Sequence, residues 1–328
     1  MNSANKPLAR EIIQGLLTIA KLQSMVEIYG RLRPGPDSRI RTNLSPVGTD
    51  TGRFSSRETF LEVSTNLQNI PKKTAKADPL YNVRSVMVPD PGYVLIECDL
   101  SQAEARVTAG LAADKRTLDL FDSGVDIHKL TASKIFDCEI EEVTGQQRTL
   151  GKMARHALNY GMGWKRFLTN VNKDADLTGV AIDAKTAKKI VSKYHKDNPL
   201  LLRWWRSVEE QVKTKGYLTN SYGRKRIFID KSNVNAMIAY LPQSTIADHL
   251  NAVLAEVIRE LDGPDFITLL QIHDAVLGQS PVAKHLQSAR KLKSMMEKTL
   301  EINGLHVKLP ADASISRESW AKMKELNV

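Results

Sequence analysis

The sequence predicts an α/β protein in which a small antiparallel sheet is divided along the chain by a long helical insertion. Residues 93–99 (YVLIECD) are rich in β-forming side chains and follow a Pro-Gly breaker, which indicates a strand. Residues 266–279 (FITLLQIHDAVLGQ) hold two apolar runs around His273 and Asp274, a pattern typical of a hairpin whose tight turn carries the His-Asp pair. Between them, residues 116–232 place apolar side chains mostly at helical spacing.

The remaining segments follow from the same periodicities. A helix is expected over 8–29, ending before the breaker-rich stretch 33–38 (RPGPDS), whereas residues 40–92 show no regular pattern. Further helices are expected at 102–113, 128–136, 144–159, 184–195, 198–214, 234–261 and 282–302, with a short C-terminal segment after the last one.

Composition narrows the class of partner. The chain has 328 residues and 42% hydrophobic content, which is normal for a cored protein. Lys and Arg number 47 against 37 Asp and Glu, giving a formal charge of +10 that favours a polyanion such as nucleic acid. Charge alone leaves the alternative open, because many basic proteins bind no nucleic acid.

Cysteine usage and the N-terminus indicate the compartment. Cys98 and Cys138 are too few for a disulfide framework and lack the His/Cys spacing of a zinc site, so a reducing, intracellular setting is expected. The first 23 residues contain no apolar run long enough for a signal core or a membrane span. We therefore expect a soluble protein, cytoplasmic in a bacterium or in a phage-infected host, with no membrane partner.

Two acids stand at the ends of apolar strands, where a carboxylate loses hydration unless a positive charge compensates it. They are Asp99 and Asp274. If their strands are neighbours, both carboxylates reach one pair of metal ions roughly 3.5 to 4 Å apart, an arrangement that serves phosphoryl transfer. Magnesium suits such oxygen ligands. The alternative for either acid alone is an ordinary turn or helix-cap residue.

A stripe of functional side chains lies in the helix expected over 144–159 and just beyond it. Its members recur every four positions, so successive ones lie only about 40° apart around a helix. They are Arg148, Lys152, His156 and Tyr160. A solvated charged face is the alternative, but solvent requires no aromatic ring there. Cations for phosphate oxygens and flat rings for a base suit a nucleoside triphosphate.

Three segments resemble the motifs of the bacterial DNA polymerase I family (family A). Residues 99–106 (DLSQAEAR) resemble motif A, usually DYSQIELR, and residues 148–161 (RTLGKMARHALNYG) resemble motif B. Residues 271–274 (QIHD) resemble motif C, usually QVHDE. Further matches occur in the family's order from about residue 15 to the C-terminus: KLQS at 21–24, TGRFSS at 51–56, NLQNIP at 66–71, DIH at 126–128, YGRKR at 222–226, PQSTIAD at 242–248 and SW at 319–320.

The resemblance implies a template-directed DNA polymerase that uses two magnesium ions, for which manganese can substitute. Asp99, Asp274 and the backbone carbonyl of Leu100 would bind the metals. Arg148 and Lys152 would grip the incoming triphosphate, and Lys152 could also protonate the pyrophosphate leaving group.

Other contacts carried over from the family concern the nucleotide and the DNA. Glu104 matches the steric gate against a ribose 2′-hydroxyl, although an ordinary first-turn helix acid is the alternative. The further dNTP-binding residues implied are His156, Tyr160, Gln102 and His128. The primer and template contacts implied are Arg53, Gln243, Gln271, His273 and Arg224, the last equally well a generic phosphate contact.

The resemblance also implies a right-hand polymerase architecture without a full thumb. Residues 1–40 would form the thumb-to-palm helix and linker, 41–115 the first part of the palm, 116–234 the fingers and 235–328 the second part of the palm. No 3′–5′ exonuclease is expected in these residues. Another polypeptide that supplies the thumb or exonuclease function is one expectation, and truncation of the sequence is the other.

The sequence departs from the family at motifs B and C. Ala275 replaces the usual Glu after the motif C aspartate, which puts metal affinity in question, and His156 and Ala157 replace an aromatic residue and a Gly. Two other functions remain to be weighed. A two-metal nuclease would use the same acids but has no need of the stripe, and a catalytically inactive DNA-binding scaffold of a replication complex would bind DNA without extending primers.

Overall fold

The computed structural model describes residues 6–57, 66–70, 82–173 and 175–328. Parts of the expected segments therefore lie outside the described residues: 1–5 of the N-terminal segment, 58–65 and 71–81 of the first palm segment, and Pro71 at the end of the NLQNIP match. All residues assigned above to the site fall inside the described ranges.

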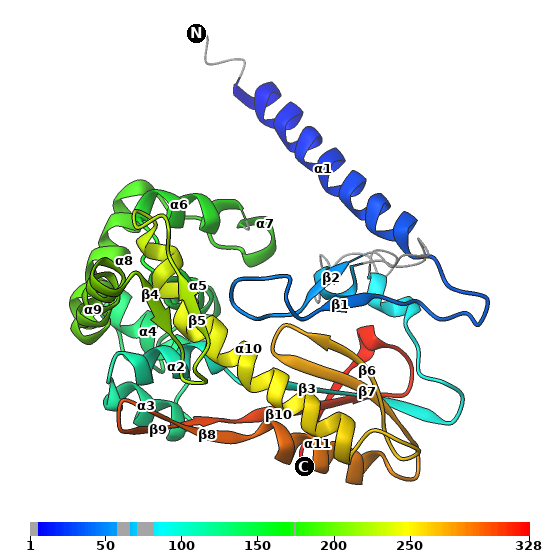
Figure 1. The fold of residues 1–328 in the computed structure, drawn as a ribbon. Helices are drawn as coiled ribbons and strands as arrows, with labels where there is room; N and C mark the ends of the chain where they lie inside the picture. Colours follow the sequence, from blue (N-terminus) through cyan, green and yellow to red (C-terminus); the bar gives the residue numbers. More distant parts are fainter. Residues whose placement is uncertain (1–5, 58–65, 71–81, 174) are drawn as a thin grey trace.

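A five-stranded antiparallel sheet forms the base of the molecule, in the order β11-β10-β3-β7-β6 (Figure 1). Its strands are β3 (Tyr93–Leu100), β6 (Ile267–Ile272), β7 (Ala275–Pro281), β10 (Ala311–Ser316) and β11 (Lys324–Leu326). The strand expected at 93–99 and the hairpin with a two-residue turn at 273–274 are both confirmed. The central position of β3 agrees with its nearly continuous burial.

The two faces of this sheet have different cores, because successive side chains of a strand point to opposite faces. Ile96, Cys98 and Leu100 of β3 belong to the larger core, which the sheet shares with three helices. These helices are α2 (Ala103–Leu111), α10 (Val234–Glu260) and α11 (His285–Met296). Leu95 belongs to a smaller core on the other face, together with Trp320.

A helical region lies between β3 and α10 along the chain, as the sequence predicts, and Figure 1 shows it beside the sheet. Its own core is built around large side chains such as Phe167 and Trp204. The helices are α3 (Lys115–Asp122), α4 (Ile127–Phe136), α5 (Gly145–Leu158), α6 (Trp164–Lys173), α7 (Ala175–Thr178), α8 (Ala184–Asp197) and α9 (Pro199–Lys215). The hairpin of β4 (Tyr217–Thr219) and β5 (Lys225–Ile227) follows them.

Helix α10 joins the helical region to the sheet. Its first half packs Met237 and Tyr240 into the helical core, whereas its second half packs Leu250 and Val257 into the larger core of the sheet. Figure 1 shows this helix crossing from one region to the other. The sequence prediction of one long helix over 234–261 is confirmed.

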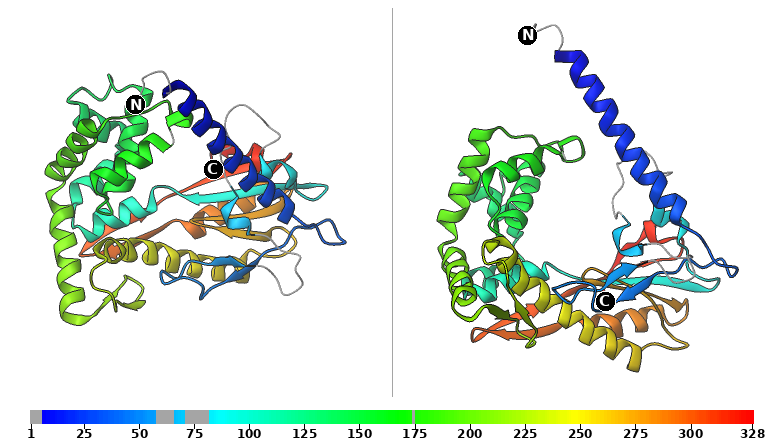
Figure 2. Two further views of the ribbon diagram at one scale, coloured as in Figure 1. Left: turned by 90° about the horizontal axis from the view of Figure 1, so that it is seen from above. Right: turned by 45° about the horizontal axis from the view of Figure 1, so that its top comes forward.

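The N-terminal part begins with α1 (Lys6–Arg31), which confirms the helix predicted at 8–29. Figure 2 shows α1 projecting away from the remainder of the molecule. The short strands β1 (Asn43–Ser45) and β2 (Ser55–Arg57) form a separate pair, and three short 3₁₀ helices complete the described elements. These are η2 (Leu67–Asn69), η4 (Val83–Val86) and η5 (Trp320–Lys322).

The prediction for the C-terminal part is wrong in two respects. The helix expected over 282–302 ends at Met296, and β8 (Lys298–Ile302) then pairs with β9 (Leu305–Leu309). Asn303 and Gly304 form the turn with φ of 52° and 72°, which is the Asn-Gly signal of a tight hairpin. The expected short C-terminal segment supplies β10, which pairs directly with β3. In the described part of the chain, no helix is both long and apolar enough to span a bilayer.

Candidate active site

The β3–β7 ladder brings the two predicted acids to one end of the sheet. Asp99, the penultimate residue of β3, lies opposite Ala275, and Asp274 is the neighbouring residue in the turn. The backbone N–H of Leu100 donates a 3.0 Å hydrogen bond to the carbonyl oxygen of Asp274. His273 adopts a left-handed φ of 52°, as the first position of a tight hairpin turn requires.

Electrostatics at this pair favour a cation. Burial and then the charge of Asp99 raise the pKa of Asp274 to about 7, since desolvation and a nearby like charge both disfavour ionisation. Asp99, Asp274 and Ala275 line a cavity of about 370 Å³. Two carboxylates that repel each other beside an open cavity fit hard divalent ions, which accept oxygen ligands and complete their shell with water or substrate phosphate.

The described residues hold no cluster of three or more His, Cys, Asp or Glu side chains arranged to bind a metal. The oxygen ligands that this end of the sheet could offer to a divalent ion are the carboxylates of Asp99 and Asp274 and backbone oxygen such as the Leu100 carbonyl. Such a sparse ligand set is typical of magnesium sites that are completed by substrate phosphates.

Glu104 connects this acidic pair to the helical region. It lies in the first turn of α2, forms an ion pair with Arg53 and accepts a hydrogen bond from the hydroxyl of Tyr160. Its charge contributes to the raised pKa of Asp274 and acts on the pKa of His156 in the helical region. Glu104 therefore lies at the junction between the acidic pair and the end of α5.

Helix α5 carries most of the predicted stripe. Thr144 and Gln147 form a reciprocal capping box at its start, which satisfies backbone donors that would otherwise have no partner. Lys152 and His156 are exposed, and Arg148 is half-exposed. Lys152 therefore projects from the helix into solvent, whereas Arg148 is held at the helix surface by its ion pair with Asp126.

Tyr160 is not on this helix, which corrects the prediction of one continuous helical stripe. Helix α5 ends at Leu158, and Gly161 takes a left-handed φ of 72° two residues after Asn159, the residue that caps it. Tyr160 is held instead by its bond to Glu104, and burial raises the pKa of its phenol. The turn after α5 thus directs this ring toward α2.

The start of α5 is fixed by contact with α4. Arg148 Nε donates a 2.6 Å hydrogen bond to Asp126, the residue whose carboxylate also caps α4.

The rings of His128 and His156 lie 5.9 Å apart. Burial and the neighbouring His156 lower the pKa of His128 to about 4. His156 as a residue is exposed, but the protein atoms around its imidazole still lower the pKa of this ring by desolvation, and the charge of Lys152 acts in the same direction. These lowered pKa values favour the neutral form of both imidazoles at pH 7.

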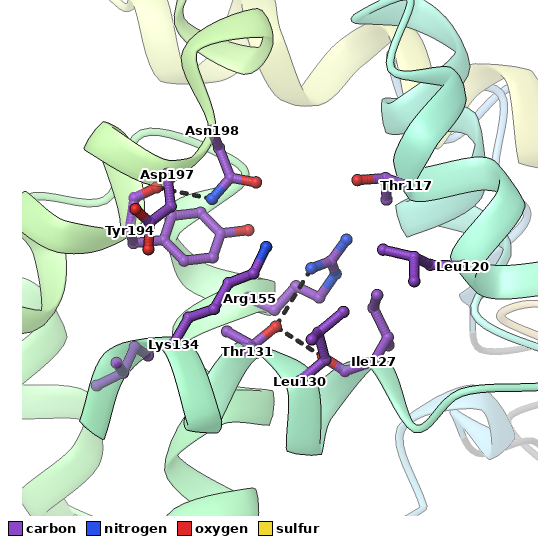
Figure 3. A pocket seen from close by; sticks show the side chains of 11 residues that line it. Thr117, Leu120, Ile127, Leu130, Thr131, Lys134, Arg155, Tyr194, Asp197 and Asn198 are labelled. Carbon is purple, nitrogen blue, oxygen red and sulfur yellow. Dashed lines mark hydrogen bonds between the residues drawn. The ribbon is translucent and has the colours of Figure 1, made fainter. Parts of the chain in front are cut away.

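A different cavity lies within the helical region, between α3, α4 and α8 (Figure 3). Arg155, Lys134 and Tyr194 point into it, and Arg155 donates a 3.2 Å hydrogen bond to the Thr131 hydroxyl. Its volume of about 20 Å³ leaves room for about one water molecule. It is lined by none of the predicted site residues.

Comparison with known proteins agrees with this arrangement. A model of DNA polymerase family A matches residues 1–322, nearly the whole chain. The protein belongs to DNA polymerase family A. Thermostable DNA polymerase I of Thermus aquaticus is 27% identical over 97% of this chain and 37% of its own length. DNA polymerase I of Caldicellulosiruptor bescii is 28% identical over 87% of this chain and 32% of its own length.

Among solved structures, the POL domain of Pol1 from M. smegmatis, in complex with DNA primer-template and dNTP, superimposes with a TM-score of 0.80. The two share 23% sequence identity, and the match covers 97% of this chain and 55% of the other. The likeness confirms the predicted polymerase fold. The chain spans about 37% of the length of the Thermus aquaticus relative.

The predicted DNA contacts of this family A protein occupy varied environments. Gln271 is buried; it donates a 2.6 Å hydrogen bond to the His273 carbonyl and accepts one of 3.0 Å from Gln68. This pair braces the turn that carries Asp274. Gln243 is partly exposed on α10.

Arg224 is held by the Asp248 carboxylate, to which its Nη2 and Nε donate at 2.6 and 2.9 Å. It packs so closely on Gly52 that a Cβ there would lie 2.6 Å from the guanidinium carbon. Gln102 is exposed at the N-cap of α2 with a left-handed φ of 53°.

The sequence predictions for this polymerase family member missed a buried charged group beside the acids. Glu97 and Arg84 are 4% and 6% exposed, and both line the cavity of Asp99 and Asp274. Glu97 could have been noticed from the sequence, because it is a charged residue inside the apolar run YVLIECD and a buried carboxylate requires a partner. Of the partners of Glu97, Arg84 comes from the stretch 40–92, which shows no regular pattern, and Trp320 comes from the C-terminal segment.

Proposed function

We propose that this chain catalyses template-directed DNA synthesis, adding deoxynucleotides to a primer 3′-hydroxyl with two magnesium ions. The observation that carries the proposal is the junction at Glu104, which joins the Asp99–Asp274 pair to the end of the helix that bears Lys152 and Arg148. A neighbour of the same fold was solved with DNA primer-template and dNTP. Net charge of +10 suits such a polyanionic partner.

In this mechanism, Asp99 and Asp274 would hold the metal ions, which would supply the positive charge that favours ionisation of the primer hydroxyl and offsets charge on the phosphates. Arg148 and Lys152 bind the triphosphate oxygens, and Lys152 donates a proton to the departing pyrophosphate. Because Arg148 is tethered to Asp126, its guanidinium is already oriented before the nucleotide arrives.

Glu104 would restrict the sugar pocket. Its carboxylate is fixed from two sides by Arg53 and Tyr160, so it is a rigid obstacle to a ribose 2′-hydroxyl. His156 would stack on the base as a neutral ring, with Gln102 and His128 at the edge of the nucleotide site.

Primer and template would pass over the palm. We assign Arg53, His273, Gln271, Gln243 and Arg224 to that path. In this assignment the sheet with residues 41–115 and 235–328 is the palm, residues 116–234 are the fingers, and residues 1–40 are the helix and linker between thumb and palm.

The test is primer extension on a defined template with magnesium and each dNTP. Asp274→Asn should reduce the extension rate on the order of 10³-fold, because several kcal/mol of charge stabilisation are lost, while DNA binding persists. Asp119→Asn is the matched control, since Asp119 lies exposed on α3 in an ion pair with Lys115. Equal loss in both variants, or extension that survives in Asp274→Asn, would refute the proposal.

A primer with a mismatched 3′ end distinguishes a polymerase from a two-metal nuclease, the alternative that the two acids by themselves would also fit. A two-metal nuclease would shorten this primer in magnesium without dNTPs, whereas the proposed enzyme leaves its length unchanged. A scaffold without activity would neither shorten nor extend a matched primer. Extension that requires dNTPs therefore supports only the polymerase.

A further inference from the structure

A buried group of three side chains lies behind the acidic pair, on the same face of the sheet. Glu97 and Asp99 are alternate residues of β3 and so point to the same side. Glu97 Oε2 accepts a 2.6 Å hydrogen bond from the indole N–H of Trp320 and lies 3.8 Å from Arg84 Nη1. Arg84, Glu97, Asp99 and Asp274 all line one cavity.

Arg84 is held firmly but its charge is incompletely matched. Its guanidinium lies 3.7 Å from the centre of the Trp320 ring and donates a 3.1 Å hydrogen bond to the Ile70 carbonyl. The 3.8 Å separation from Glu97 is too long for a hydrogen bond. Its Nε atom is buried and has no hydrogen-bond partner among the described residues. Besides Glu97, the charge of Asp99 acts on Arg84.

A buried ion pair of this kind is a poor stabiliser, because the lost hydration of both charges offsets their attraction. An apolar pair of similar volume would serve packing equally well. Arg84 and Glu97 line the same cavity as Asp99, and the charge of Asp99 acts on Arg84, so the location of the pair points instead to a task in the site.

We propose that Arg84 is a positioning residue that steadies the Asp99 carboxylate when no metal is bound, and that Glu97 and Trp320 hold Arg84 back so that it does not compete with the metal. This inference rests on the proposed function, since it assigns Asp99 to metal binding. Opposite Asp99 stand the uncharged Ala275 on β7 and the exposed Asp312 on β10. Glu97, unlike Asp312, lines the cavity of Asp99 and Asp274.

Glu97→Gln is the first variant. It removes the negative charge behind Arg84 but keeps an acceptor for the Trp320 N–H. Arg84 should then move toward Asp99, and the dissociation constant for Mn²⁺ should rise about tenfold, the usual effect of disturbing groups behind metal ligands. The magnesium concentration for half-maximal extension should rise in parallel, whereas the rate at saturating magnesium should fall less than twofold.

The double variant Arg84→Met with Glu97→Gln is the discriminating one. It removes both buried charges together, so no unpaired charge remains to unfold the chain. With the competing cation gone, Mn²⁺ affinity should return to that of the parent protein or exceed it. A merely structural role of Glu97 predicts that the double variant binds metal no better than Glu97→Gln.

The measurements are Mn²⁺ binding to the protein without DNA, followed by electron paramagnetic resonance, and the melting temperature of each variant. Unchanged Mn²⁺ affinity in Glu97→Gln, or failure of the double variant to recover, would overturn the inference. These results are distinct from failure of the proposed function, in which the parent protein itself binds no Mn²⁺ and extends no primer.

Discussion

The backbone N–H of Leu100 donates a 3.0 Å hydrogen bond to the carbonyl of Asp274, across 174 positions of sequence. This bond closes the end of the β3–β7 ladder next to the Asp99–Ala275 pair. The backbone geometry of this ladder therefore sets where Asp99 and Asp274 lie relative to each other. Rigid elements of this kind position catalytic groups more accurately than loops do.

Removal of the Asp274 charge should change how stability depends on pH. The pKa of Asp274 is about 7, above its ordinary value of 3.8, so between these values the folded chain holds a proton that the unfolded chain has released. The raised pKa of Asp274 therefore contributes to the free energy of unfolding. This contribution is fully present below pH 3.8 and is lost as pH rises through 7.

With metal removed by EDTA, the melting temperature of Asp274→Asn relative to the parent should therefore increase between pH 5 and pH 8, by on the order of 2 °C. Differential scanning calorimetry at both pH values measures it. Magnesium at pH 8 should stabilise only the parent. If the melting temperatures of Asp274→Asn and the parent differ by the same amount at pH 5 and pH 8, the raised pKa of Asp274 is contradicted.

Lys152 should act on the rate more than on folding. Its side chain is exposed, so Lys152→Gln should leave the melting temperature unchanged. Loss of a proton donor and a phosphate contact should lower the extension rate roughly 10² to 10⁴-fold. Lys185→Gln on α8 is a matched control, since Lys185 is equally exposed in the helical region but belongs to no site contact. Single-turnover extension would show the difference, and equal rates would exclude the role.

Selection against ribonucleotides should depend on Glu104. Glu104→Ala removes the proposed obstacle and should improve rNTP incorporation relative to dNTP by about 10-fold or more, the range for one steric contact. Tyr160→Phe keeps the carboxylate but removes one of the two groups that orient it, so its effect should be smaller. Competing rNTP and dNTP in primer extension gives the ratio. If Glu104→Ala discriminates between rNTP and dNTP as well as the parent does, another residue must exclude ribonucleotides.

Ala275 offers a test of charge at the metal site. It is 6% exposed and lies opposite Asp99, so Ala275→Glu places a third carboxylate beside the acidic pair. The dissociation constant for the metal should fall by roughly threefold to tenfold, because affinity for hard cations rises with the number of charged oxygen ligands. Without metal at pH 8, repulsion should lower the melting temperature. Ala275→Gln has similar volume without charge, and should show neither effect.

Local pattern was sufficient for much of the fold. The strand at 93–99, the hairpin around His273 and Asp274 and the helix over 144–159 were predictable, because alternation and helical periodicity reflect which face each side chain buries. The C-terminal hairpin was missed although Asn303-Gly304 marks its turn. The helical spacing of apolar residues that predicts a helix there does not mark the residue at which that helix ends.

The site was predictable in part. Asp99 and Asp274 stand out as acids after apolar strands, and Arg148, Lys152 and His156 share a spacing. The end of α5 before Tyr160 was not evident, because a bond to Glu104 and a turn at Gly161 decide it. Glu97 and Arg84 were missed for a related reason, since the Trp320 that contacts both comes from the far end of the chain.

The sequence by itself determined most of the long helices, the strand at 93–99 and the hairpin at 273–274, and it determined which residues carry reactive groups, because those properties depend on neighbours a few positions away. Tertiary structure decided which strands pair, that β10 from the C-terminus lies beside β3, and that Glu104 meets Arg53 and Tyr160. Such pairings depend on the free energy of the whole packed core, in which residues hundreds of positions apart exclude water together.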